Sequence, residues 1–213
     1  QPGTVIHYTT NGEEPNKNNA SYTEPVIIRK NFTTLKAKVF GKGFLPSETT
    51  QATFVKDGLK LKKVEFSQPN EGYSGEGVTT LMDNKGGLPS FTSKTWLGFN
   101  EDTVSIAIST DKKQNVSSVL FNLLQDYGSW IFFPYKAEVY STLNGRIVKQ
   151  GELLFTAKEN IDVSVCRPYL IKFKRRIKAD IIKVQLYLLK NIPDWHPGRG
   201  QSSWIFIDEI KLY

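Results

Sequence analysis

The chain has 213 residues, of which 39% are hydrophobic and 12% aromatic, enough for one large or two small domains with packed cores. Its 9 Tyr, 13 Phe and 4 Trp favour β structure, and no apolar run approaches the roughly 20 residues of a membrane span. A single cysteine, Cys166, excludes an internal disulfide framework and a cysteine-based zinc site, and we expect it to fill a space in the core.

The chain opens with Gln1, Pro2 and Gly3 and passes directly into a predicted strand, so no signal peptide is visible. We interpret the sequence as a processed product or a piece of a longer chain. The missing signal then carries no information about location.

Residues 1–57 are predicted to form a small β domain. Asn11-Gly12 marks a tight turn, and Pro25 indicates a strand at a sheet edge. These strands are too few for a complete sandwich. The predicted extended segments cover residues 4–10, 22–28, 34–40 and 49–55.

A specific pattern runs through this part of the chain. It consists of Ile6 to Pro15, then Tyr22 and Pro25, then Thr34 to Lys38, then Pro46-Ser47. The pattern resembles the C-terminal module of chitobiases and β-hexosaminidases, an immunoglobulin- or fibronectin-like sandwich that accompanies glycosidase domains. Asn11-Gly12-Glu13 departs from the Asp-Gly-Ser or Asp-Gly-Thr that is usual in the family. The resemblance implies an upstream catalytic domain in the same chain.

Residues 58–213 follow a short junction and are predicted to form a larger β domain. Asn144-Gly145 predicts a hairpin turn, and no segment predicts a helix longer than one or two turns. Many short strands at regular spacing favour a jelly roll or a sandwich. The predicted strands cover residues 59–66, 104–108, 116–124, 129–133, 137–141, 153–156, 169–173, 181–189 and 204–212.

The last strand is predicted to alternate regularly. Trp204, Phe206, Asp208 and Ile210 are expected on one face, and Ser203, Ile205, Ile207, Glu209 and Lys211 on the other. Glu209 is unusual because it is a carboxylate in an otherwise apolar strand end. A buried carboxylate needs a partner, and a metal ion is one candidate.

A second pattern spans residues 59–213. It consists of Leu81-Met82-Asp83 with nearby glycines, Trp96, Val139-Tyr140-Ser141 and the ending Ile207 to Ile210. This order resembles the discoidin (coagulation-factor type C) jelly roll, a galactose-binding-like fold that many carbohydrate-binding modules use. The loops Asp194–Gly198 and Ser129–Phe132 look like a bacterial subgroup attached to chitobiase-like and other polysaccharide-degrading proteins. Residues 125–130 replace the loop that better-known discoidin modules have at that place.

The discoidin resemblance implies a structural Ca²⁺ between an early loop and the last strand. The residues that would supply its ligands are Asp83, the carbonyl of Lys85, a hydroxyl from Ser90 or Ser93, and Glu209. Calcium takes six to eight oxygens, many of them carbonyls. The alternative is that the carboxylates form salt bridges with lysine or cap turns.

Carbohydrate sites combine an aromatic side chain that stacks on the sugar ring with polar groups that bind the hydroxyls. The residues that meet this description are Trp195, His196 and Arg199 in one loop and Asp126, Tyr127 and Trp130 in another. We expect both loops to project from the core and form one patch. The alternative is that the loop tryptophans pack inside, as we expect Trp96 and Trp204 to do.

The net charge is +7, and its densest run is Lys172 to Lys178. In regular strand register Lys172, Lys174, Arg176 and Lys178 would share one face, and Ile171, Phe173, Arg175 and Ile177 the other. A solvated strand face explains this run, and binding to nucleic acid or an acidic polysaccharide is the alternative. No recognition helix, zinc finger or ribonucleoprotein motif supports nucleic acid, so we expect no nucleic-acid partner.

No catalytic motif is present. The sequence has no P-loop, no Gly-x-Ser-x-Gly, no His-Glu-x-x-His and no βα repeat for a catalytic barrel. We therefore expect no catalytic residues and no enzyme activity. The chain is predicted to be an all-β, monomeric, glycan-binding region of an exported bacterial glycosidase-like protein, located outside the cell, on its surface or in the periplasm. The alternative is a structural or protein-interaction module without glycan affinity.

Overall fold

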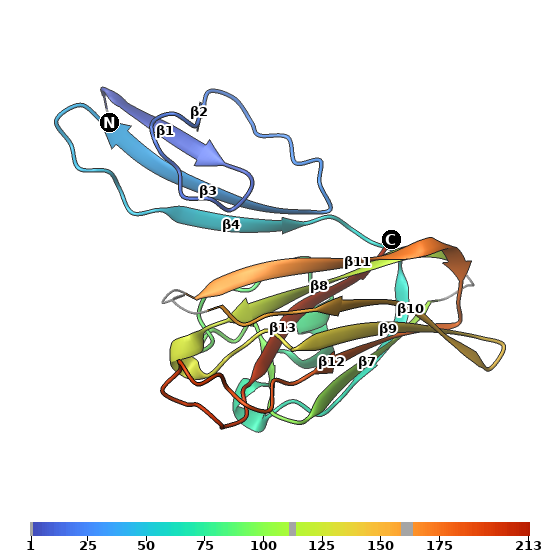
Figure 1. The fold of residues 1–213 in the computed structure, drawn as a ribbon. Coiled ribbons are helices and arrows are strands. Elements are labelled where there is room, and N and C mark those ends of the chain that lie inside the picture. The colour runs from blue at the N-terminus through green and yellow to red at the C-terminus, as the bar shows by residue number, and fades with distance from the viewer. Residues whose placement is uncertain (1, 111–113, 159–163) are drawn as a thin grey trace. The chain divides into compact units, whose positions relative to one another are not determined.

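The computed structural model describes residues 2–110, 114–158 and 164–213 and is all-β, with only short 3-10 turns besides the strands (Figure 1). The chain divides into two compact units. The first contains Gln1–Asp57 with Asn84–Gly86, and the second contains Gly58–Asp83 with Gly87–Tyr213.

The first unit is a single antiparallel sheet in the order β2-β1-β3-β4 within its described residues. Its strands are β1 (Thr4–Thr9), β2 (Ala20–Ser21), β3 (Phe32–Gly41) and β4 (Thr50–Val55). The predicted extended segment at residues 22–28 forms no strand, although the Tyr22 amide still donates to the Ile6 carbonyl of β1 over 2.8 Å. The described residues of this unit thus form one sheet, and the predicted second sheet of a sandwich is not among them.

The second unit is a jelly roll of two antiparallel sheets. One sheet has the order β10-β9-β12-β7-β5 and the other β11-β8-β13-β6. The strands are β5 (Leu61–Phe66), β6 (Leu97–Phe99), β7 (Thr103–Thr110), β8 (Asn115–Gln125), β9 (Lys136–Leu143), β10 (Arg146–Leu154), β11 (Val165–Lys178), β12 (Ile181–Tyr187) and β13 (Ile205–Leu212). Short 3-10 turns cover η1 (Glu71–Tyr73), η2 (Gly77–Leu81) and η3 (Tyr127–Ser129).

The core lies between the two sheets. Alternate residues of β7 are buried, namely Val104, Ile106 and Ile108, as expected for a strand with one face on the core. They join a cluster that includes Phe121 from β8 and Ile207 from β13, in the opposite sheet. The strand alternation thus packs the two sheets face to face.

The predicted hairpin turn at Asn144-Gly145 is confirmed. Both residues have positive φ angles, 51° and 77°, as the turn between two right-twisted strands requires. β9 and β10 pair directly on either side of it.

The predicted faces of the last strand are wrong beyond Ile207. The pairing of β13 with β8 shifts between Ile207 and Ile210, so that one extra residue stands on β13. This bulge contains Asp208 and Glu209. It returns Ile210 and Leu212 to the core cluster that already holds Ile205 and Ile207.

The predicted alternation of the basic run is also wrong. The pairing of β11 with β8 shifts between Lys172 and Ile177, where four residues of β11, 173–176, stand opposite one residue of β8, Ser117. Phe173 stays buried, but Arg175, predicted to share its face, is exposed together with Lys174 and Arg176.

The predicted strand at residues 129–133 is replaced by η3 and an isolated bridge at Ile131. Asp126 begins this turn because its carboxylate accepts a hydrogen bond from the Ser129 amide, 3.1 Å away. Among the described residues, no helix is both long and apolar enough to cross a bilayer.

Candidate functional site

Two of the predicted loops meet at one end of the jelly roll. One loop follows β8 and the other precedes β13, and both lie at the same end of the unit in Figure 1. The Trp204 amide donates to the Trp130 carbonyl over 2.9 Å, and the Phe132 amide donates to the Trp204 carbonyl over 3.1 Å. These bonds fix the two loops against each other.

Asp126 holds the first loop together. Besides the Ser129 amide, its carboxylate accepts a hydrogen bond from the Ser164 hydroxyl at 2.6 Å. One oxygen of Asp126 thus bonds within the loop, the other joins the loop to the segment before β11, and the residue is a support for the predicted patch.

Tyr127 and His196 form the base of the loop pair. Tyr127 is 7% exposed, stacks on Phe132 with 4.4 Å between ring centroids, and has its pKa raised by burial. His196 is 6% exposed; its Nδ1 accepts from the Gly198 amide at 3.0 Å, and its Nε2 lies 2.9 Å from the Tyr127 carbonyl. This geometry requires the proton on Nε2, which then donates to the carbonyl. Contrary to the expectation, these two side chains do not project from the core.

Trp130 is the exposed aromatic residue of the pair of loops. Its side chain is 40% exposed, and its backbone is left-handed, with φ 60° and ψ 23°. A bulky residue in this conformation costs roughly 1–2 kcal/mol. The indole lies against Gly198, where an added Cβ would come within 2.9 Å of the ring. Gly198 therefore leaves room for the indole against the second loop.

Trp195 and Arg199 complete the predicted set. Trp195 is half-buried and packs on Tyr127 and Phe132, with ring centroids 5.2 and 6.3 Å apart. Arg199 is exposed, and its amide donates to the His196 carbonyl at 3.0 Å. The structure thus brings the predicted residues together, with Trp130 and Arg199 facing solvent above a buried base.

A hollow of about 280 Å³ beside these loops was missed by the sequence analysis. Tyr73 and Phe91 line it, with ring centroids 6.1 Å apart, and Tyr73 also lies 5.4 Å from the ring of Trp204. Its polar lining includes Glu71 and Lys94. The glycine-rich segment 69–77 contains Tyr73. An aromatic residue in such a loop could have indicated a second binding surface from the sequence.

Several of the residues predicted to bind calcium have other polar partners in the structure. Glu209 is fully buried, and its carboxylate lies 2.9 Å from Lys211 Nζ, which supports the salt-bridge alternative. The Ser90 hydroxyl lies 3.0 Å from that of Thr92, within its own loop. Lys85 belongs to the first compact unit, whereas Asp83, Ser90 and Glu209 belong to the second.

Asp208, next to Glu209 in β13, is a second buried carboxylate of the last strand. Burial raises the pKa of Asp208 well above its usual range, and the charges of Glu209 and Asp83 raise that pKa further. Oxygen donors of this kind suit Ca²⁺. No three His, Cys, Asp or Glu side chains converge among the residues that the structure describes, so backbone carbonyls would have to supply most of the ligands.

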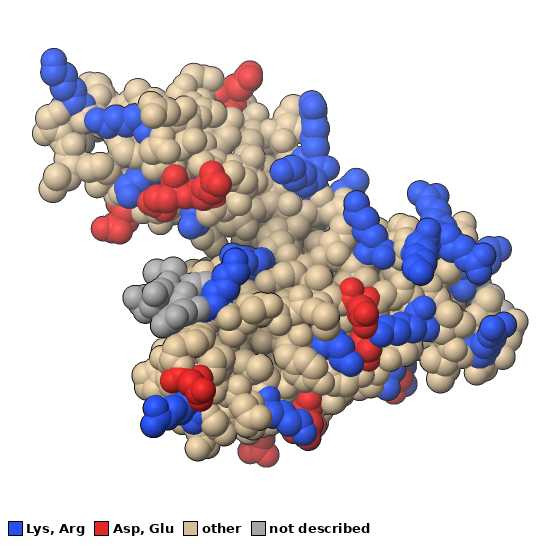
Figure 2. All heavy atoms as spheres, in the orientation of Figure 1, with Lys and Arg blue, Asp and Glu red and all other residues tan. Residues whose placement is uncertain are grey.

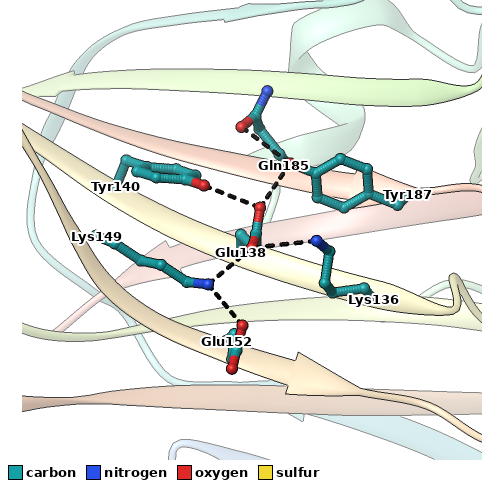
Figure 3. A network of polar contacts seen from close by, with 7 residues as sticks. All are labelled: Lys136, Glu138, Tyr140, Lys149, Glu152, Gln185 and Tyr187. Atoms are coloured by element: carbon teal, nitrogen blue, oxygen red, sulfur yellow. Dashed lines mark hydrogen bonds and ion pairs between the residues drawn. The ribbon is translucent and has the colours of Figure 1, made fainter.

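A polar network on the outer face of the five-stranded sheet was also missed (Figure 3). Glu138, 6% exposed, accepts from Tyr187 at 2.6 Å, Lys149 at 2.7 Å and Tyr140 at 2.9 Å, and lies 3.2 Å from Lys136. Burial opposes the charge of Glu138, but these donors together lower its pKa to about 2. A carboxyl group of so low a pKa is a poor proton donor near neutral pH.

Comparison with known proteins gives partial matches. Residues 1–54 match the family model described as Fn3 associated, which covers 54 of the 213 residues. The search of curated proteins found no match.

Three solved structures illustrate the fold likeness. The structure of SpGH29 is 11% identical over 74% of this chain, with a TM-score of 0.46, and this chain spans 28% of it. The family 32 carbohydrate-binding module from Streptococcus pneumoniae EndoD is 12% identical over 74% of this chain and 96% of its own, with a TM-score of 0.46. The family 32 module from C. perfringens NanJ, in complex with galactose, is 15% identical over 70% of this chain and 91% of its own, with a TM-score of 0.44. Likenesses at this level assign no ligand or activity to this chain.

Proposed function

We propose that the second unit is a non-catalytic glycan-binding module whose site is the loop end around Trp130. The observation that carries the proposal is an exposed indole held on Gly198 in a left-handed backbone conformation. A strained, exposed aromatic residue on a rigid base is a costly arrangement unless its surface is used.

The chemistry of the loop end suits a sugar. The apolar face of a pyranose ring stacks on an indole, while its hydroxyls need hydrogen-bonding groups around the rim. Arg199 in the same loop pair and Glu71 and Lys94 in the neighbouring hollow are such groups. His196 and Asp126 act on the ligand only through the shape of the loops they hold.

The carboxylates support a module without hydrolytic activity. Hydrolysis of a glycoside needs one accessible carboxyl group with a raised pKa, paired across a cleft with a second carboxylate. Glu138 has a lowered pKa, and Asp208, whose pKa is raised, is 1% exposed and therefore out of reach of a substrate.

For the wider context, we propose an exported, chitobiase-like bacterial glycosidase with its catalytic domain upstream, acting outside the cell, on its surface or in the periplasm. The module, monomeric by itself, would hold that enzyme near polysaccharide and so raise the effective substrate concentration. A structural Ca²⁺ held through Asp83, Ser90 and Glu209 of the second unit remains part of the proposal.

A structural or protein-interaction module is the second candidate. One observation favours it: Trp195 packs within the aromatic cluster of Tyr127 and Phe132, so the loop pair would be stable without a ligand.

A glycan array followed by titration of the best glycan tests the proposal. We expect Trp130→Ala to abolish binding and leave the melting temperature unchanged. Gly198→Ala should also weaken binding, because the new methyl group displaces the indole. Tyr22→Ala, which removes another exposed aromatic side chain in the first unit, is the matched control. Absence of any bound glycan on the array, or unchanged affinity of Trp130→Ala, would favour the second candidate.

A further inference from the structure

A hollow of about 970 Å³ lies between β10 and β11 in the second unit. Pockets that bind ligands span roughly 300–1,000 Å³, so this one has room for several sugar units. β8 runs from Asn115, paired with Lys178, to Gln125, next to the Trp130 loop. At about 3.3 Å per residue, the hollow and that loop are roughly 30 Å apart.

The hollow exists because β10 and β11 are edge strands of different sheets. They touch where Gly151 packs on Ile171, since an added Cβ there would lie 2.6 Å from the Ile171 side chain. The shift in the β11 pairing removes residues 173–176 from the regular ladder with β8. Lys174, Arg175 and Arg176 consequently stand exposed in succession along the rim.

The lining is strongly cationic. Its charged residues are Arg146, Lys149, Lys174, Arg175, Arg176 and Lys178, and no described Asp or Glu lines the hollow. Figure 2 shows Lys and Arg side chains gathered on the right, at the end of the unit that carries the β9–β10 turn.

Most of this charge is not neutralised within the chain. Lys149 is held by Glu138 at 2.7 Å and Glu152 at 2.6 Å. Among the described residues, the other five cations of the lining form no ion pair. Like charges close together repel one another, so an arrangement of this kind gains stability when an anion binds.

We propose that this hollow binds an acidic polysaccharide, a glycan whose sugar units carry carboxylate or sulfate groups. Arg175 and Arg176 can each form two parallel hydrogen bonds to such a group. Amide and hydroxyl groups for the sugar hydroxyls are present in Gln150, Asn144 and Ser141. The site is distinct from the Trp130 loops and does not rest on their binding a glycan.

A glycan fits these observations better than a nucleic acid does. Sites for single-stranded nucleic acid interleave cations with aromatic side chains on which bases stack. The described residues that line the hollow include no aromatic residue; its apolar members are Leu143, Val148 and Ile177. Aliphatic side chains suit the edges of sugar rings and offer no surface for base stacking.

Dextran sulfate and polygalacturonate test the proposal, with neutral dextran as the uncharged control, using the full chain and isothermal titration. We expect both polyanions to bind, with an affinity that falls as salt rises, and dextran not to bind. Arg175→Gln/Arg176→Gln should weaken binding of both polyanions at least about tenfold. Because both side chains are exposed, the melting curve of this double variant should match that of the unsubstituted chain.

Lys60→Gln/Lys62→Gln is the matched control. It removes the same charge from exposed positions at and beside β5, the opposite edge of the same sheet as β10. Polyanion binding to this variant should change less than twofold. Trp130→Ala should bind dextran sulfate normally, which separates this site from the loop end.

Three results would overturn the proposal. Equal weakening by the two double variants would mean that only the overall charge matters. Binding of neutral dextran as tight as that of dextran sulfate would remove the role of the anionic groups. Single-stranded DNA bound more tightly than either polyanion, and released by Arg175→Gln/Arg176→Gln, would identify a nucleic-acid site instead.

Discussion

The two ends of the jelly roll differ in how they present their exposed residues. At one end Trp130 stands on a base of buried rings and hydrogen-bonded loops, including Tyr127 and His196. At the other end Arg175 and Arg176 are exposed on an interrupted edge strand, in succession along the chain. Rigid aromatic platforms lose little entropy on binding, whereas flexible cations attract their ligands over longer distances. The two proposals together assign one unit two kinds of binding surface, the first selective for shape and the second for charge.

The largest effect is expected at the base of the aromatic end. Phe132 is 1% exposed and stacks on Tyr127. Phe132→Ala should lower the free energy of unfolding by about 3–5 kcal/mol, because the cavity removes packing under both loops. Urea denaturation measures this. A loss below about 1 kcal/mol would show that the loops do not depend on this base, and the contrast between the two ends would disappear.

A bound Ca²⁺ would stabilise the aromatic end of the unit more than the basic end, because Glu209 lies in β13, directly after the second loop of that end. If Ca²⁺ binds the native state, an excess of 100 times its dissociation constant adds about 2.7 kcal/mol of stability. We expect chelator to lower the melting temperature and to speed hydrogen exchange in residues 87–96 and β13, but not in β10. Identical melting curves, with no calcium by elemental analysis, would remove the metal.

Glu138 is expected to stabilise the folded unit, and its partner Lys149 belongs to the lining of the basic hollow. Glu138→Gln should cost roughly 1–3 kcal/mol, because several donors lose a charged acceptor, although Lys136 and Lys149 are partly solvated. The pKa of Glu138 is lowered from 4.5 to about 2, so its contribution is present above pH 4.5 and is lost as the pH falls toward 2. Thermal melts between these pH values should show this loss.

Glu152→Gln is the control for that experiment. Glu152 is exposed and its carboxylate forms an ion pair with Lys149, so its removal should change the melting temperature little. If both variants had the same pH profile as the unsubstituted chain, Glu138 would not be held ionised by its neighbours.

The smallest effect on stability is expected for Trp130→Ala. An exposed side chain can be removed with a change within about 0.5 kcal/mol, and alanine partly keeps the strain of the left-handed backbone. Differential scanning calorimetry of Trp130→Ala and Phe132→Ala compares the stability lost at the exposed indole with that lost at the buried ring beneath it. A loss of several kcal/mol would place Trp130 in the core and contradict its use as a platform.

Local patterns were sufficient for much of the fold. The alternation in β7 specifies which side chains are buried, because side chains of a regular strand point to opposite faces in turn. Asn144-Gly145 specifies a hairpin through its backbone preferences alone. The proposed site was predicted as a set of residues, since tryptophan and histidine between prolines and glycines indicate ordered loops.

The roles within that set were beyond the reach of sequence patterns. Trp130, Tyr127 and His196 have similar loop settings in the sequence, yet one is exposed and two are buried. The difference depends on Phe132 and on the facing loop, which are brought close only in the folded chain.

The sequence by itself determined an all-β chain, the hairpin and the residue types available for binding, because strand alternation and turn preference are local properties. The tertiary structure alone decided the bulges at Asp208-Glu209 and after Lys172. A bulge depends on the register of the partner strand, which both chain segments set together. The bulge in β13 contains Glu209, whose carboxylate lies beside Lys211. The bulge in β11 leaves Arg175 exposed at the edge of the basic hollow.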